Sequence, residues 1–126
     1  MIAIPLDNEG STEISKLYGN SAFFAFLDEE TGSFKVVENP ACGDGLNTAK
    51  FISSQNIDST IFYYMGDKVY EYLIEKGLKV YSCLKTHLSI DAIYMQLSTC
   101  DCIEVTKENS STLLDSGNGG CTCKAK

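Results

Sequence analysis

The sequence predicts an α/β domain built on a mixed β-sheet. Two features predict this class. Two apolar runs joined by a short polar turn are typical of a β-hairpin, and a later alternation of strand-like and helix-like patterns is typical of parallel strands with crossover helices. The 126 residues suffice for one domain with a single buried core. The expected order along the chain is β-ββ-α-β-α-β-α.

The first half of the chain supplies three strands, expected at residues 2–6, 23–28 and 34–39. Pro5 favours a position at a sheet edge or a strand end, because proline cannot donate to a strand ladder. The turn Glu30-Thr31-Gly32-Ser33 joins the second and third strands into a hairpin. Asn39-Pro40 ends the third strand.

The second half of the chain alternates helices with strands expected at residues 60–65 and 78–82. Apolar residues at helical spacing predict one helix after Asp44-Gly45, a second after Asp67 and a third after Ser89. Asp67 and Ser89 are the expected N-caps, and Gly77 is expected just past the end of the second helix.

The chain divides into a folded part and a polar tail. From Lys107 onward the sequence is rich in Gly, Ser and Asn, which is the composition of a flexible segment. We therefore expect an α/β domain over residues 1–103 and a flexible tail over residues 104–126.

The composition limits the classes of ligand. Seventeen acidic residues against ten lysines, with no arginine, give a formal net charge of −7. Such a surface argues against binding to nucleic acid, which needs clustered cations. The longest apolar run, residues 22–27, is too short to cross a membrane, and the first residues do not have the pattern of a signal peptide. We expect a cytoplasmic protein whose cysteines are reduced thiols.

The cysteines are the main chemical signal. Cys100 and Cys102 form one C-x-C pair, and Cys121 and Cys123 form another at the end of the tail. Residues two apart in an extended chain point to the same side, so each pair can face one metal ion or two adjacent metals of a cluster. Thiolates are the ligands that zinc, cuprous ions and iron–sulfur clusters prefer. An unliganded, solvent-facing role for these thiols remains open.

The other two cysteines lie inside the predicted domain. Cys42 occupies a loop before a helix, where a thiolate is stabilised, and Gly43 and Gly45 beside it permit close backbone approach. Cys83 ends an apolar strand, and a small buried hydrophobic residue is the favoured interpretation there.

Several other polar residues carry weaker signals. His87 is the only histidine, and a capping or surface role is favoured over a ligand role. Asp7 and Asp67 follow strands and could hold Mg²⁺, but a nuclease would need more carboxylates and a basic groove. The chain has no G-x-S-x-G, Walker or G-x-G-x-x-G motif, so hydrolase, nucleotide triphosphatase and dinucleotide functions have no support from motifs.

The order of three segments resembles a known family. The segments are IAIPLD, LYGNSAFFAFLDEETGSFKVVENPA and, after the glycine loop and the first helix, IFYYMGDKVYEYLIEKGLKVYSC. Over roughly residues 1–98 the chain resembles the dinitrogenase iron–molybdenum cofactor biosynthesis proteins, namely the NifX-like and NifB C-terminal-like domains. The most specific pieces are the turn at Gly19 and residues 37–40 and 77–81.

The resemblance implies a ribonuclease-H-like three-layer α/β/α fold without nuclease activity. It also implies that the protein binds or carries the iron–molybdenum cofactor or a related metal–sulfur cluster; some relatives hold a molybdenum–copper sulfide cluster non-covalently. Family members often carry histidines in two loops that here read Leu17-Tyr18-Gly19 and residues 41–45. Cys42 is the soft ligand left in that region.

We therefore expect a non-enzymatic carrier or scaffold for a metal–sulfur cluster of the iron–sulfur, iron–molybdenum or thiomolybdate type. The expected thiolate ligands are Cys100, Cys102, Cys121 and Cys123, and the expected cofactor-binding residues are Cys42, Gly43 and Gly45. A cluster-donor or cluster-acceptor protein is the expected partner, and open sheet edges could support an oligomer. Two alternatives remain open: a dithiol redox or sulfur-transfer protein that uses its C-x-C pairs, and a simple interaction domain.

Overall fold

The computed structural model describes residues 1–16, 18–19, 21–83, 86, 88–99, 102–106, 108 and 114. The elements along the chain are β1 (Ile2–Leu6), β2 (Phe23–Leu27), β3 (Phe34–Glu38), α1 (Gly45–Ser54), β4 (Ser59–Phe62), α2 (Asp67–Glu75), β5 (Lys79–Ser82), α3 (Ile90–Ser98) and β6 (Ile103–Glu104). The first eight occur in the expected order. The short strand β6 follows them, and no sequence pattern predicts it.

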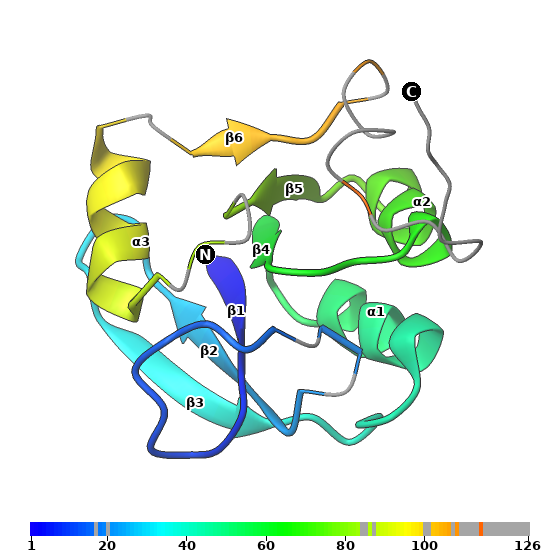
Figure 1. Ribbon diagram of the computed structural model, residues 1–126, viewed down its shortest axis with the longest axis horizontal. Helices are drawn as coiled ribbons and strands as arrows, with labels where there is room; N and C mark the ends of the chain where they lie inside the picture. Colours follow the sequence, from blue (N-terminus) through cyan, green and yellow to red (C-terminus); the bar gives the residue numbers. More distant parts are fainter. Residues whose placement is uncertain are drawn as a thin grey trace.

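The six strands form one mixed sheet in the order β3-β2-β1-β4-β5-β6. β1, β2 and β3 pair antiparallel, β1, β4 and β5 pair parallel, and β6 pairs antiparallel with β5. Helices α1 and α2 cover one face of the sheet and α3 covers the other (Figure 1). The prediction of an α/β domain with a mixed sheet is therefore confirmed.

Two hydrophobic clusters fill the spaces between the layers. In β1, Ile2, Ile4 and Leu6 join the cluster beneath α3, while Ala3 joins the cluster beneath α1 and α2. This alternation follows from the two-residue period of a strand, and all five residues of β1 are buried. Burial on both faces explains why the strand has a continuous apolar sequence.

The helix ends follow the sequence signals with one exception. The Ser89 side chain accepts a hydrogen bond from the Ala92 N–H at 3.0 Å, so Ser89 is the N-cap of α3 as predicted. Gly77, with φ +86°, ends α2. Its N–H donates to the carbonyl of Ile74, and the next N–H donates to that of Leu73, which is a Schellman motif.

The exception is Asp67, which was wrongly predicted to be the N-cap of α2. Gly66 is the cap, and it makes no side-chain capping hydrogen bond. Asp67 is the first helical residue, where its negative charge still interacts favourably with the helix dipole.

The end of β4 and the place of Pro5 in the sheet also differ from the prediction. β4 ends at Phe62, because Tyr63 and Met65 pack over the end of the sheet on opposite faces instead of continuing the ladder. Pro5 lies in β1, which is an interior strand of the sheet. However, β1 pairs with β4 only at Ile2 and Ala3, so Pro5 lies beyond that ladder. The expected domain boundary after residue 103 falls inside β6.

The chain after β6 contributes to the core. Val105 is 1% exposed, its N–H donates to the carbonyl of Val80 at 2.7 Å, and its carbonyl accepts from the Tyr70 hydroxyl at 3.2 Å. Leu114 is also buried in the cluster beneath α1 and α2. Among the described ranges, no helix has the length and apolar character that a membrane crossing requires.

Candidate functional site

The carboxyl ends of the parallel strands define one edge of the sheet. β3 runs parallel to β1, since both pair antiparallel with β2. The connections after β1, β3, β4 and β5 therefore all leave at this carboxyl edge, and α1, α2 and α3 all begin there. Open α/β sheets bind ligands outside the carboxyl ends of their strands, so this edge is the natural place for a site.

The loop that carries Cys42 is held by two buried polar side chains. Asn39 is 3% exposed, and its side-chain amide donates to the carbonyl of Ser21 at 2.8 Å and to the Thr48 hydroxyl at 3.1 Å. The Asn39 side-chain oxygen accepts from the N–H of Ala41 at 3.0 Å. One side chain thus ties the loop to the segment before β2 and to α1.

Thr48 of α1 completes this arrangement from below. It is fully buried. Its hydroxyl can donate to the carbonyl of Gly19 at 3.2 Å or to the carbonyl of Ala41 at 3.1 Å. We call Asn39 and Thr48 the polar hub. The polar hub joins the turn that holds Tyr18, Gly19 and Ser21, the loop at residues 39–44 and the first turn of α1.

Glycines allow these three segments to approach closely. A Cβ atom added to Gly19 would lie 2.6 Å from the Cα of Gly45, a distance that real Cβ contacts do not reach. Gly43 has φ +97°, and its N–H donates to the carbonyl of Gly19 at 3.0 Å. The loop before α1 therefore packs backbone to backbone against the Gly19 turn.

A buried tyrosine lies beneath the same turn. The Tyr18 hydroxyl lies 2.7 Å from the Thr60 hydroxyl, which donates to the carbonyl of Ala3 at 2.9 Å. Tyr18 is therefore the donor to Thr60. Burial raises the pKa of Tyr18, and the hydrogen bond to Thr60 offsets only part of this shift. Tyr18 is a neutral structural anchor between the turn and β4.

Cationic and aromatic side chains lie on the other side of this turn. The ammonium group of Lys16 is 5.9 Å from the centre of the Tyr63 ring, and Tyr63 contacts Tyr64 edge to face at 4.8 Å. Lys68 lies in the first turn of α2 at the same edge. These residues place two positive charges at the carboxyl edge of an acidic protein.

Comparisons with known proteins agree with this geometry. A family model described as dinitrogenase iron-molybdenum cofactor matches residues 1–97. The chain belongs to the dinitrogenase iron-molybdenum cofactor family. The apo form of the orange protein from Desulfovibrio gigas has a similar fold, with a TM-score of 0.73 and 22% identity over 83% of this chain and 92% of that one.

Two further structures share the fold of this family member. A candidate NifB protein from Thermotoga is 24% identical over 85% of this chain and 97% of that chain, with a TM-score of 0.67. A candidate dinitrogenase from Methanocaldococcus jannaschii is 17% identical over 83% and 93% of the two chains, with a TM-score of 0.65. At these identities the likeness establishes the fold. No curated protein matches the chain.

The predicted cofactor-binding residues of this family member lie together at the carboxyl edge. Cys42 is exposed on the loop before α1. Gly43 and Gly45 lie next to it, but the N–H of Gly43 donates to Gly19 and so does not face a ligand. A Cβ atom on Gly45 would lie 3.1 Å from a methyl group of Val69 in α2. Both glycines therefore allow the loop to pack closely against neighbouring segments.

The predicted thiolate ligands are only partly described. Cys102 is half-buried, and Cys100, Cys121 and Cys123 lie outside the described residues. Cys42 follows β3, and Cys102 precedes β6, whose start lies beside the end of β5, so both cysteines lie at the carboxyl edge of the sheet. Within the described part of the chain, no three His, Cys, Asp or Glu side chains form a group that could hold a metal ion.

The polar residues with weaker signals have structural roles or lie outside the description. Asp7 accepts a hydrogen bond from the Ser15 hydroxyl at 2.6 Å, which holds the segment after β1. Asp67 begins α2, and His87 lies outside the described residues. The polar hub itself was not predicted, although Asn39 stands in the Asn-Pro motif that supports the family resemblance.

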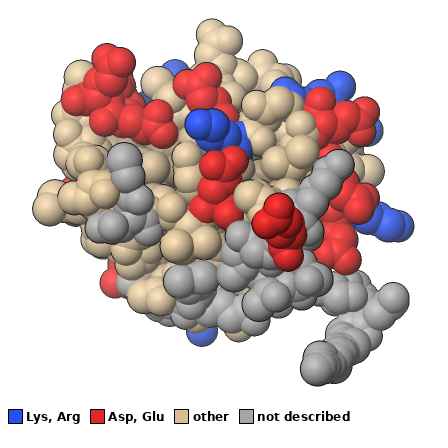
Figure 2. Space-filling view, turned by 90° about the horizontal axis from the view of Figure 1, so that it is seen from above, with Lys and Arg blue, Asp and Glu red and all other residues tan. Residues whose placement is uncertain are grey.

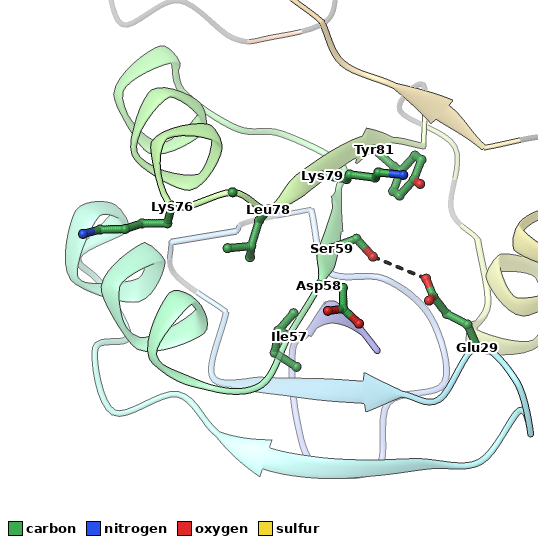
Figure 3. Close-up of a pocket in the computed structure, with 9 residues that line it drawn as sticks. Glu29, Ile57, Asp58, Ser59, Lys76, Leu78, Lys79 and Tyr81 are labelled. Atoms are coloured by element: carbon green, nitrogen blue, oxygen red, sulfur yellow. Dashed lines mark hydrogen bonds between the residues drawn. The ribbon is translucent and has the colours of Figure 1, made fainter.

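The opposite, amino edge of the sheet carries an open pocket of 490 Å³ (Figure 3). Glu29 reaches across it to the hydroxyl of Ser59, which donates to it at 3.4 Å. The Met1 ammonium donates to Asp58 at 2.8 Å and lies 3.6 Å from Glu29. Burial lowers the pKa of this ammonium group, but the hydrogen bond to Asp58 and the charge of Glu29 outweigh burial and raise it above 8.0.

On the face seen from above, acidic side chains form several separate patches, with few lysines among them (Figure 2). This distribution agrees with the net charge of −7.

Proposed function

We propose that this protein is a non-enzymatic carrier for a metal–sulfur cluster of the iron–sulfur, iron–molybdenum or thiomolybdate type. Membership of the iron-molybdenum cofactor family is the observation that carries this proposal. The cluster is the cargo of the protein, and the partner would be a cluster-donor or cluster-acceptor protein.

The carboxyl edge supports the proposal because its local chemistry suits an anionic sulfide. The exposed thiol of Cys42 is a soft ligand on a loop whose backbone is fixed by the polar hub. Lys16 and Lys68 lie at the same carboxyl edge, and the N-cap of α2, Gly66, makes no side-chain capping hydrogen bond. A rigid loop with one exposed thiol can bind a preformed cluster without enclosing it.

The tail cysteines form the second part of the proposal. Cys100, Cys102, Cys121 and Cys123 would supply thiolates to the same cluster or to a second one.

We also propose that the fold is of the ribonuclease-H-like type without nuclease activity. The strand order supports this description, with an antiparallel β3-β2-β1 unit followed by the parallel strands β4 and β5.

Anaerobic reconstitution tests the proposal. The full chain is purified without oxygen and incubated with iron and sulfide, or with tetrathiomolybdate with and without cuprous ion. Bound metal is then measured by elemental analysis and visible absorption after gel filtration. We expect stoichiometric uptake of at least one of these, and a colourless, metal-free protein in every case would refute the carrier function.

Three variants locate the site. Cys42→Ser removes the exposed thiol at the carboxyl edge, and the double variant Cys121→Ser/Cys123→Ser removes the last C-x-C pair. The matched control is Ser53→Ala, an exchange on the surface of α1 away from its first turn. Loss of uptake in Cys42→Ser assigns cargo binding to the carboxyl edge, and loss in the double variant assigns it to the last C-x-C pair. Loss in both means that both parts hold the cargo, whereas loss in the control indicates a general defect.

A further inference from the structure

Two cysteines flank the β5–β6 pair: Cys83 directly follows β5, and Cys102 directly precedes β6. β5 and β6 pair antiparallel, with Tyr81 opposite Glu104 and Ser82 opposite Ile103. Extending this register by one residue places Cys83 opposite Cys102. Residues directly opposite in an antiparallel pair carry their side chains on the same face of the sheet.

Contacts on both faces agree with this placement. Cys83 belongs to the hydrophobic cluster beneath α3, and the Cys102 sulfur donates to the side-chain oxygen of Gln96 in α3 at 3.9 Å. Val105, three residues after Cys102, belongs to the cluster on the other face, as strand alternation requires. Both thiols therefore lie on the α3 face.

The hydrogen-bond pattern fixes the type of pair. The N–H of Val105 donates to Val80, which makes these two residues a hydrogen-bonded pair, so the alternation of pairs makes Cys83 and Cys102 a non-hydrogen-bonded one. The N–H of Cys83 accordingly points to the other side, where it donates to Phe62 at 3.1 Å. Cα atoms in such a pair are about 4.5 Å apart, and disulfides require about 4.4 to 6.8 Å.

We propose that Cys83 and Cys102 are a reversible redox pair that forms a cross-strand disulfide. Oxidation removes two electrons and two protons from the two thiols and forms one S–S bond. A peroxide is the oxidant: its O–O bond breaks and, for hydrogen peroxide, the two oxygens take up the electrons and protons as two water molecules. A dithiol reductant reverses the step.

The surroundings favour a disulfide over a metal ion at this pair. Cys83 is 4% exposed among apolar side chains, and metal binding would bury charged thiolates there, whereas a disulfide is uncharged. The disulfide would tie together the two ends of the segment that contains α3. It would also remove Cys102 from the set of tail thiolates, so oxidation would weaken any cargo binding that uses Cys102. The disulfide itself forms whether or not the protein binds a cargo.

Peptide mapping tests this pairing in the full chain. The reduced protein is treated with one equivalent of hydrogen peroxide, alkylated and digested with trypsin without reductant. Cleavage after lysine places Cys83 in the peptide 80–85 and both Cys100 and Cys102 in the peptide 86–107. We expect these peptides to be linked in the wild type and in Cys100→Ser, and to be separate in Cys102→Ser and after treatment with dithiothreitol.

The variants separate the competing outcomes. A link that persists in Cys102→Ser and disappears in Cys100→Ser would overturn the proposal, as would a link between Cys100 and Cys102 within one peptide in place of the expected one. Stoichiometric zinc binding that requires Cys102 and prevents any link would also overturn it. Cys83→Ala, checked for folding by circular dichroism, is a second way to remove the link. No cluster is present in this experiment, so failure of the carrier function leaves its result unchanged.

Discussion

The substitution Thr48→Val tests whether the polar hub holds the Cys42 loop. Valine has nearly the shape of threonine and a similar helix propensity, so the change removes the hydroxyl and little else. Gly19 and Ala41 each keep another donor for their carbonyl groups, from the N–H groups of Gly43 and Asp44 at 3.0 Å. The group left without its partner is one N–H of Asn39, which is buried.

A buried donor that loses its acceptor costs about 1–3 kcal/mol. We expect Thr48→Val to reduce the free energy of unfolding by about 2 kcal/mol, which lowers the urea midpoint by about 1 M if the slope is about 2 kcal/mol per molar. Thr48→Ser is the matched control, since it keeps the hydroxyl and loses one buried methyl group, at a cost of about 1 kcal/mol.

Amide hydrogen exchange gives the local readout. The N–H groups of Ala41 and Gly43 depend on the Asn39 side chain and on the Gly19 carbonyl, so they should exchange at least tenfold faster in Thr48→Val, while the β1–β2 amides change only with global stability. We expect cargo affinity to fall with the protection of the loop. Equal destabilisation by valine and serine, with unchanged protection of these two amides, would refute the role of the polar hub.

Three further predictions follow from the packing. In urea melts, Gly19→Ala should destabilise the protein more than Gly77→Ala. The added Cβ at residue 19 would collide with the backbone of α1, whereas residue 77 has open space around it. Only the φ of +86° opposes a side chain at residue 77, at a cost of about 1–2 kcal/mol. Thr60→Val should cost more than Tyr18→Phe, because it leaves the buried tyrosine hydroxyl without its acceptor, whereas Thr60 keeps its bond to β1. The hydrogen bond from the amino terminus lowers the pKa of Asp58 and helps to raise the pKa of the terminus. The pair should therefore stabilise the fold slightly between about pH 4 and 8. This stabilisation is lost as pH falls through the pKa of Asp58 or rises through the pKa of the terminus. In Asp58→Asn, an NMR titration should find the pKa of the terminus lowered.

The sequence contains most of the fold because its signals are local. The hairpin turn, the Ser89 cap and the glycine after α2 act through neighbouring residues, and each is found where it was predicted. Tyr63 and Met65 misled the strand prediction, because aromatic and apolar residues that pack over the end of a sheet have the same composition as a strand. β6 was missed because two exposed residues carry no periodicity.

The sequence predicts where the candidate site lies but not which contacts hold its loop. Cys42 and its glycines follow a predicted strand and precede a predicted helix, so their position at the carboxyl edge follows from the chain order. The polar hub depends on Asn39 reaching Ser21 and Thr48, contacts that span 18 and 9 residues and that no local pattern encodes. The same limit applies to Gly43, an expected cofactor-binding residue whose N–H donates to the carbonyl of Gly19, 24 residues away.

The cysteines show why spacing alone gives an incomplete account of a thiol site. In the sequence, Cys102 groups with Cys100 because the two are neighbours, and residues two apart in an extended chain share a side. The register of β6 against β5 gives Cys102 a different neighbour, Cys83, which is distant in sequence and was interpreted as a simple core residue. A short strand without a sequence signal thus decides which sulfur atoms meet. Assignment of thiol chemistry in this protein must start from the β5–β6 register and only then turn to the C-x-C motif.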